Sequence, residues 1–260
     1  MTLKKTGANY KGLSPFKEER TPSLLVSPTK NIFKDFSTGI GGNSISFYMK
    51  INNLSFPEAV EELSEKYNIS IEKLNINREK SSKNTKYYEI MKTAQTYFSE
   101  SVKKSKEALK YMNDRDFSIE DIKRFGIGFS QNSWDGLLNY LTKKGYETDD
   151  FIVLGLVRKN EEGKVFDYYR KRIMFPIYNN SMKLIGFGGR IIEKGSNAPK
   201  YLNSPDSKIF KKGKELFGLY NKGENIRKKG LVILMEGYLD VLTAHKHGFN
   251  NSVASLGTAF

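Results

Sequence analysis

Apolar and polar positions follow different periods along the chain, and this divides it into regions with distinct predicted elements. Residues 2–74 begin with short strand-like runs interrupted by Gly and Pro, after which Tyr48–Tyr67 has the apolar spacing of helices. Pro57, after Ser55 and one further residue, suits the first position of a helix, where no N–H is needed. Residues 75–86 are almost entirely polar, which predicts a linker.

The middle of the chain, from residue 87 to about residue 145, has apolar residues at helical spacing and is predicted to be helical. We interpret its aromatic stripe as core packing. Ser118 predicts a helix N-cap, with Asp121 three residues later in place of the usual Glu. After residue 150 the pattern changes to short strand-like runs separated by turns.

The last thirty residues predict a strand, a helix and a second strand. The run Leu231–Met235 is typical of a buried strand, a helix is expected over Tyr238–His247, and Ser252–Leu256 is a further short apolar run. This order is typical of the beginning of a parallel α/β sheet. Together with the strand-rich opening and the helical middle, it predicts an α+β protein.

The charge balance indicates a polyanionic partner. The 260 residues include 43 Lys and Arg against 29 Asp and Glu, a formal net charge of +14. The lack of a long basic amphipathic helix favours nucleic acid over a membrane surface, while a lysine-rich surface without a partner is the alternative interpretation. An apolar fraction of 38% argues against disorder, and no apolar run is long enough to span a bilayer, so we expect a cytoplasmic protein.

Cysteine is absent, and the sequence has two histidines, His245 and His247. Disulfides, thiolate zinc sites and cysteine nucleophiles are thereby excluded. The two histidines are two residues apart, which places them on different faces of a helix. A histidine-rich metal site is therefore not expected.

Two carboxylates follow the predicted strand Leu231–Met235. Glu236 lies at its carboxyl end, where open parallel sheets place functional groups, and Asp240 follows one helical turn later. Such a pair suits Mg²⁺ or Mn²⁺, which prefer hard oxygen ligands. The alternative is that Asp240 is a first-turn acid favoured by the helix dipole, and the residues alone leave both interpretations open.

Basic residues accompany glycines and aromatic residues between residues 124 and 212. Arg190 follows Gly186–Gly189, where absent side chains would let a phosphate backbone approach, and Lys200 precedes Tyr201. Basic groups interleaved with aromatic ones are typical of single-stranded nucleic-acid binding, and a solvated lysine face is the competing interpretation. The candidate residues are Arg124, Arg172, Arg190, Lys200, Lys211 and Lys212.

Ten motifs follow one another along the chain: Tyr10–Phe16, Thr21–Ser23, Gly41–Asn43, Leu54–Leu63, Arg124–Gly128, Arg172–Ile177, Gly186–Arg190, Pro199–Pro205, Leu216–Tyr220 and Glu236–Asp240. In this order they resemble the bacterial DnaG-type DNA primases. The first three are similar to the zinc-binding domain of that family and the fourth to the helix that follows it. The next five are similar to its polymerase core, and the last to the first motif of a TOPRIM fold.

The resemblance implies a division into domains. Residues 1–74 are expected to form a small zinc-ribbon-like domain and residues 75–86 a linker. Residues 87–229 would then be the N-terminal part of a mixed α/β polymerase core, and residues 230–260 the start of an incomplete TOPRIM sheet.

The resemblance also implies an activity, the synthesis of short RNA primers on single-stranded DNA from ribonucleoside triphosphates during replication. Glu236 falls on the TOPRIM glutamate, which acts as acid/base or near the metal, and Asp240 on the acid of the same motif, with Mg or Mn as the cofactor. The positions that the family uses for template and nucleotide phosphates carry Arg124, Arg190, Lys200 and Lys212.

The opening domain departs from the family at its metal site. The family holds zinc with Cys-x-x-His and Cys-x-x-Cys, and those four positions carry Ser14, Lys17, Asp35 and Thr38 in this chain. These groups cannot rebuild a thiolate site, and Lys17 would repel the ion. We expect no structural zinc, and packing in its place.

The end of the chain is a second departure. Further TOPRIM acids and a helicase-binding domain follow Gly257 in the family, so we expect an incomplete metal site, no docking domain for the replicative helicase, and a fragment or a natural truncation of a primase. The main alternative is a non-catalytic module that binds single-stranded DNA. Another TOPRIM enzyme, such as a nuclease or topoisomerase, is disfavoured by the motifs between residues 10–43 and 124–220.

Overall fold

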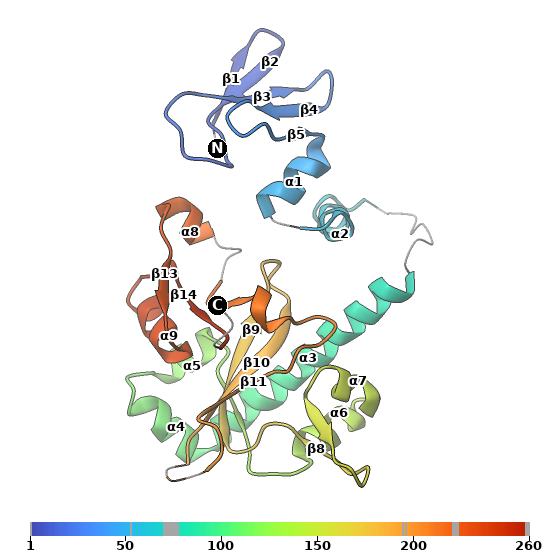
Figure 1. Cartoon of the computed structure of the whole chain (residues 1–260), viewed down its shortest axis with the longest axis vertical. Coiled ribbons are helices and arrows are strands. Elements are labelled where there is room, and N and C mark those ends of the chain that lie inside the picture. Colours follow the sequence, from blue (N-terminus) through green and yellow to red (C-terminus); the bar gives the residue numbers. More distant parts are fainter. Residues whose placement is uncertain are drawn as a thin grey trace. The chain divides into compact units, whose positions relative to one another are not determined.

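The computed structural model describes residues 2–52, 54–69, 78–193, 195, 197–219 and 224–257, with the backbone alone for 78–83. The chain divides into two compact units, Met1–Leu74 and Asn75–Phe260 (Figure 1). Residues 230–260, expected to start a TOPRIM sheet, belong to the second unit. Within the described residues, no helix combines the length and the apolar character that a bilayer span requires.

The first unit is a five-stranded antiparallel sheet, ordered as in the sequence, followed by two helices. Its core contains the rings of Phe16, Phe33 and Phe47, whose centroids lie 4.9–6.0 Å apart. The elements are β1 (Leu3–Thr6), β2 (Asn9–Gly12), β3 (Leu24–Ser27), β4 (Ile32–Asp35), β5 (Gly41–Gly42), α1 (Ser44–Asn52) and α2 (Phe56–Tyr67).

The second unit combines an antiparallel sheet, a smaller mixed sheet and surrounding helices (Figure 1). Its helices are α3 (Arg78–Lys104), α4 (Lys106–Asn113), α5 (Ile119–Arg124), α6 (Gly136–Lys143), α7 (Thr148–Val153), α8 (Glu224–Lys229) and α9 (Tyr238–Lys246), with a 3-10 turn η1 over Lys212–Lys214. Its strands are β6 (Gly128–Ser130), β7 (Val157–Lys159), β8 (Val165–Asp167), β9 (Arg172–Tyr178), β10 (Leu184–Ile191), β11 (Tyr201–Asn203), β12 (Leu216–Phe217), β13 (Ile233–Met235) and β14 (Ser252–Ser255). The α+β class predicted from the sequence is confirmed.

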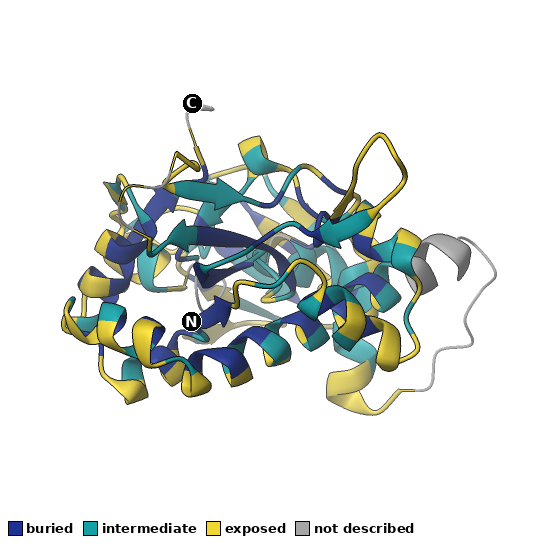
Figure 2. Ribbon diagram, turned by 90° about the horizontal axis from the view of Figure 1, so that it is seen from below, coloured by how far each residue is buried: buried dark blue, intermediate teal, exposed yellow. Residues whose placement is uncertain are grey.

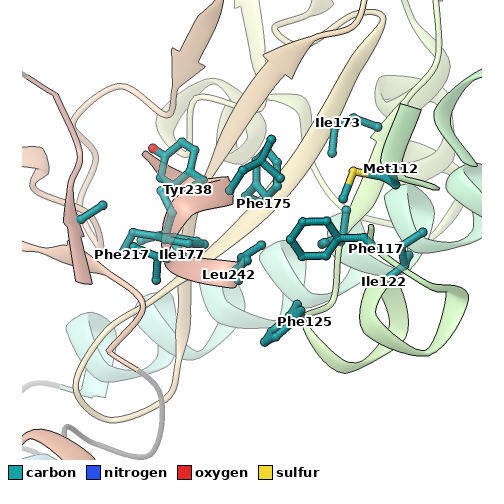
Figure 3. Close-up of a cluster of buried hydrophobic side chains, with 14 of the residues drawn as sticks. Met112, Phe117, Ile122, Phe125, Ile173, Phe175, Ile177, Phe217, Tyr238 and Leu242 are labelled. Atoms are coloured by element: carbon teal, nitrogen blue, oxygen red, sulfur yellow. The ribbon is translucent and has the colours of Figure 1, made fainter. Parts of the chain in front are cut away.

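The central sheet has the order β11-β10-β9-β6, and its β9 is buried on both faces. Successive residues of a strand point to opposite faces. Ile173 and Phe175 accordingly join a cluster that includes residues of α5 and α9 (Figure 3). Met174 joins a second cluster, which includes residues of α3 and α6. Buried and exposed residues alternate along helices such as α3 and α6, as in amphipathic helices that pack on a sheet (Figure 2).

The predicted strand–helix–strand at the end of the described chain is confirmed, since β13 and β14 pair in parallel and α9 connects them. The prediction that Leu231–Met235 is buried is wrong. Leu231, Val232 and Leu234 are 59%, 48% and 60% exposed. The reason is that β13 is an edge strand in the order β12-β14-β13, so an apolar run alone did not secure burial.

Three predicted boundaries differ from the observed ones. Of the linker expected over 75–86, residues 78–86 are helical and begin α3. The helical stretch expected over Tyr48–Tyr67 consists of two helices, α1 and α2. Pro57, expected at the first position of a helix, is the second residue of α2 after the N-cap Ser55. The helical middle of the chain is interrupted by β6. The spacing of apolar residues indicates whether a segment is a helix or a strand more reliably than it indicates the residue at which that element begins or ends.

A buried carboxylate fixes the start of α6. Asp167 is 3% exposed and accepts hydrogen bonds from the N–H groups of Leu137 and Leu138, at 2.8 and 2.9 Å. These are among the N–H groups at a helix start that have no partner within the helix. Burial raises the pKa of Asp167, and the two backbone hydrogen bonds oppose this shift. The carboxylate therefore acts as an N-cap supplied from β8.

Replacing Asp167 with Asn is expected to destabilise the second unit by about 1–3 kcal/mol, because one of the two N–H groups would then face an amide that donates instead of accepting. Urea unfolding followed through the fluorescence of Trp134 would measure this. Asp149→Asn, at an exposed position in the first turn of α7, is the matched control and is expected to stay within about 0.5 kcal/mol. Equal effects of the two substitutions would contradict the capping role.

Candidate functional site

Tyr238 joins α9 to the central sheet. Its ring is 4% exposed, stacks on Phe175 at 5.4 Å and meets Phe217 edge-on at 4.5 Å (Figure 3). Its hydroxyl donates a hydrogen bond to Asn203 Oδ1 at 2.5 Å. Tyr238 is the first residue of α9, directly after Glu236 and Gly237. Its packing therefore determines where both candidate carboxylates lie.

The glycines before Arg190 make room for protein side chains. A Cβ added to Gly188 would lie 2.4 Å from the Tyr238 ring, and one added to Gly189 would lie 2.9 Å from Tyr169 and 3.0 Å from Arg172. The sequence interpretation had these glycines open to a phosphate backbone. The structure corrects it, because the space above Gly188 and Gly189 is filled by buried side chains of the same unit.

Arg190 and Asp240 both lie close enough to Tyr201 to act on its hydroxyl. The Arg190 guanidinium donates to the Tyr201 hydroxyl at 2.5 Å and lies 5.8 Å from the ring centroid of Tyr111. Burial raises the pKa of Tyr201, Arg190 lowers it, and the negative charge of Asp240 raises it again. No carboxylate among the described residues forms an ion pair with Arg190, so its charge remains available for a ligand.

Glu236 and Asp240 are both exposed, at the carboxyl end of β13 and in the first turn of α9. A Cβ placed on Gly237 would lie 3.0 Å from Asp240 Oδ2 and 3.8 Å from the Tyr201 hydroxyl. The two carboxylates suit Mg²⁺, which proteins commonly hold with one or two carboxylates together with substrate phosphates. The described residues contain no cluster of three or more acidic or histidine ligands.

The two candidate lysines have different surroundings. Lys200 is exposed immediately before β11. Lys212 lies against Gly257, where an added Cβ would come within 2.7 Å of its ammonium nitrogen, and its backbone N–H donates to Asp206 Oδ1 at 2.9 Å. Asp206 also pairs with Lys211 at 3.5 Å, which partly neutralises that lysine. Lys200 and Lys212 are therefore better candidates than Lys211 for phosphate binding.

The remaining candidate arginines lie elsewhere. Arg172 is 4% exposed and donates to the carbonyls of Gly189 and Pro199, so it holds β9, β10 and the segment before β11 together. Arg124 is exposed at the end of α5, and its charge contributes to the lowered pKa of His245, after burial as the main cause. His245 lies in the last turn of α9, whereas Asp240 lies in the first.

An exposed aromatic cluster was not predicted from the sequence. Trp134 is 59% exposed, and the Arg170 guanidinium lies 3.3 Å from its ring centroid. Phe166 meets Trp134 edge-on at 5.7 Å, and the Arg158 guanidinium lies 4.2 Å from the ring centroid of Tyr168. The signal in the sequence was the alternation of Phe166, Tyr168 and Arg170, which an extended chain presents on one side.

A groove connects this cluster with the edge of the central sheet. Its lining includes Tyr168, Arg170, Ile191 and Leu202. Leu202 packs with the cluster beneath α3, whereas its neighbour Tyr201 packs with the opposite one. The groove and the Arg190–Tyr201 pair therefore lie on opposite faces of the sheet.

In the first unit, three of the four positions aligned with zinc ligands meet at one carboxylate. Asp35 Oδ2 accepts hydrogen bonds from Ser14 Oγ at 2.5 Å and from Thr38 Oγ1 at 2.7 Å. Lys17, at the fourth position, is exposed. Three of the aligned positions therefore converge as ligands do in a metal site, but their side chains form hydrogen bonds with one another.

Comparison with known families gives three consecutive matches: the CHC2 zinc finger over residues 1–79, the N-terminal domain of the DNA primase catalytic core over residues 97–223, and the Toprim domain over residues 230–260. The chain belongs to the DnaG-type DNA primase family. DNA primases of Clostridium acetobutylicum and Escherichia coli K12 are 43% and 36% identical to it over 99% of this chain. The match spans 43% and 45% of those primases, less than half of their length.

Solved primase structures have the same fold. The zinc-binding and RNA polymerase domains of the Aquifex aeolicus primase match all of this chain and 62% of that chain, with a TM-score of 0.63 and 35% identity. The DnaG primase catalytic domain bound to single-stranded DNA matches 68% of this chain and 57% of its own, with a TM-score of 0.59 and 35% identity. The family predicted from the motifs is thereby confirmed.

Adding a methyl group at Gly188 is expected to displace Tyr238 and to destabilise the second unit by about 1–3 kcal/mol, because the 2.4 Å approach leaves no space for it. Thermal unfolding of Gly188→Ala would measure the loss. Gly213→Ala is the control, since no atom lies within 4 Å of a Cβ added there. A melting temperature unchanged in Gly188→Ala would contradict the packing described for Tyr238.

Proposed function

We propose that this chain carries the template- and nucleotide-binding part of a DNA primase and takes part in RNA primer synthesis on single-stranded DNA. The observation that carries the proposal is the approach of Arg190, Tyr201 and Asp240 beside Glu236, in a chain with three primase-family matches in order. A cation and two carboxylates at one place suit phosphoryl transfer from a nucleoside triphosphate, which needs charge neutralisation more than covalent chemistry.

The chain's own residues would have separate tasks. Arg190, kept in place by the Tyr201 hydroxyl, would neutralise phosphate charge, and Lys200 and Lys212 would add to the positive field. Glu236 and Asp240 would hold a divalent ion, Mg²⁺ or Mn²⁺, which when bound supplies electrostatic stabilisation of the attacking and leaving oxygens. Arg124, at the end of α5 and near His245 in the last turn of α9, would contact the template backbone.

The template would also use the exposed cluster around Trp134. Single-stranded nucleic acid binds where flat rings stack on bases and cations neutralise phosphates, and Trp134 with Arg170 offers both. The groove lined by Arg170 and Leu202 gives the strand a path toward the edge of the sheet. The structural match to a primase domain bound to single-stranded DNA supports single-strand binding by this unit.

A second candidate function is single-strand binding without catalysis. It is favoured by the lack of a third acidic ligand beside Glu236 and Asp240 among the described residues. In this case the basic residues and the Trp134 cluster would act as described, and the carboxylates would not support polymerisation. The two functions differ in whether ribonucleotides are incorporated.

Incorporation of labelled ribonucleotides on single-stranded DNA, with Mg²⁺ or Mn²⁺, tests the catalytic proposal. Incorporation by the wild-type chain that falls at least about 100-fold in Glu236→Gln would support the catalytic proposal. The substitution removes the negative charge of the side chain and keeps its size. Glu224→Gln, on α8, is the matched control and is expected to keep full activity. Template binding without any incorporation would favour the second function.

The salt dependence of binding to a fluorescent single strand separates charge from stacking. Lys200→Glu is expected to flatten the slope of log K against log salt by at least about 0.7, the contribution of one phosphate contact. Trp134→Ala is expected to weaken binding by about tenfold without changing the slope, because stacking releases no counterions. Lys92→Glu, exposed on α3, controls for the change in net charge. Equal slopes in Lys200→Glu and Lys92→Glu would contradict the assignment of Lys200.

A further inference from the structure

The match to a CHC2 zinc finger implies a zinc ion in the first unit, and the residues present do not fit one. Zinc in such modules is held by four thiolate or imidazole ligands. Of the four aligned positions, Asp35 alone offers an anionic ligand, beside the hydroxyls of Ser14 and Thr38 and the ammonium of Lys17. A neutral hydroxyl is a weak zinc ligand, and the ammonium group has no lone pair to donate.

Both oxygens of Asp35 already have partners. Oδ2 accepts from Ser14 and Thr38, and Oδ1 accepts from the N–H and the hydroxyl of Ser37 at 3.0 and 2.9 Å. The Ser23 hydroxyl lies 2.8 Å from Oδ1 and shares its single proton between Asp35 and Glu19. A carboxylate offers about four lone-pair sites, and four donors besides Ser23 point to this one. Asp35 is fully buried, so these donors take the place of its hydration shell.

A second carboxylate extends the network. Glu19 Oε1 accepts from the N–H groups of Ser14 and Ser23 at 2.7 and 3.0 Å, and the Ser23 hydroxyl lies 2.7 Å from both oxygens of Glu19. Ser14 follows β2, Ser23 precedes β3 and Asp35 ends β4. The network therefore ties together the ends of three neighbouring strands.

We propose that the Asp35-centred hydrogen-bond network replaces the zinc ion as the cross-link of this unit, which then folds without a metal. A zinc ion joins two chain segments by binding both. Asp35 belongs to the second segment and joins it to the first by accepting a hydrogen bond from Ser14, while it accepts another from Thr38 within its own segment. Charge-assisted hydrogen bonds from neutral donors satisfy the carboxylate without a counter-cation. Several such bonds to one buried group form a cooperative unit.

The titration of Asp35 agrees with this arrangement. Burial alone would raise its pKa, but the hydrogen bonds from Ser14, Thr38 and Ser23 outweigh burial and hold the pKa of Asp35 well below its ordinary range. The unfolded-state pKa is about 3.9, so the contribution to stability is complete at neutral pH and is lost as the pH falls below about 4 through the folded-state value. A thiolate zinc site would release its ion near the same acidity, so pH alone does not separate the two.

Hydrogen exchange of the full chain, followed by mass spectrometry, tests the proposal together with metal analysis. The N–H groups of Ser14, Ser23 and Ser37 donate into the network, so peptides from residues 9–43 report on it directly. The wild-type chain, purified without added metal, is expected to contain far less than one zinc per chain and to exchange at the same rate with and without a chelator. Asp35→Asn is expected to exchange at least roughly tenfold faster in these peptides.

Controls keep the outcomes distinct. Glu18→Gln removes an exposed charge beside Glu19 and is expected to leave exchange unchanged, and peptides from residues 172–191 report whether the second unit is intact. Ser14→Ala and Thr38→Val each remove one donor and are expected to give smaller increases than Asp35→Asn. Stoichiometric zinc in the wild-type chain, faster exchange with a chelator, or equal behaviour of Asp35→Asn and Glu18→Gln would overturn the proposal.

A reconstructed ligand set provides the reciprocal test. The combined substitutions Ser14→Cys, Lys17→His, Asp35→Cys and Thr38→Cys restore the zinc ligand pattern at the positions where the network now lies. This variant is expected to bind one zinc and to become sensitive to the chelator in residues 9–43. Zinc binding by the variant together with chelator-insensitive exchange would show that these positions do not hold the unit together, and would overturn the proposal.

Discussion

The packing of the Tyr238 ring over Gly188 is the contact on which the candidate site depends. Close packing leaves no room for a side chain on β10 at this point, and the ring occupies the space between Phe175 and Phe217 instead. α9 begins at Tyr238, so the position of this ring relates the small mixed sheet to the central one. Without it, Glu236 and Asp240 would have no fixed relation to Arg190 and Tyr201.

The elements that the sequence predicted well are those whose local chemistry agrees with their packing. Ser118 and Asp121 form the predicted capping box, with hydrogen bonds of 3.0 and 3.1 Å between side chain and backbone. The strand–helix–strand around α9 was likewise predictable, because its apolar runs have the lengths of strands and a helix separates them. The exposure of β13 was not predictable, since the burial of a strand depends on which strands and helices lie beside it. The sequence of one strand does not contain that information.

The candidate site shows a similar division. Arg190, Lys200 and Lys212 could be selected from basic residues next to aromatic ones or glycines, but the same pattern also selected Arg172, which is buried and binds backbone carbonyls. A cationic side chain near a sheet is equally suited to join strands and to bind phosphate. Which of these roles an arginine has depends on whether its guanidinium can reach backbone carbonyls. In this unit the register of β9, β10 and β11 determines that.

The first unit shows which part of a metal site the fold itself supplies. Ser14, Asp35 and Thr38 converge because β2 and β4 lie on either side of β3 and both end at the same edge of the sheet, and this convergence does not depend on what the side chains are. A family match over residues 1–79 therefore reports the path of the chain, and the ligands must be judged residue by residue. Once the soft ligands are absent, a buried carboxylate at the same point needs donors, and short hydroxyl side chains from the neighbouring turns are the groups that reach it. The same geometry that would gather four ligands around an ion here gathers hydroxyl and N–H donors around Asp35.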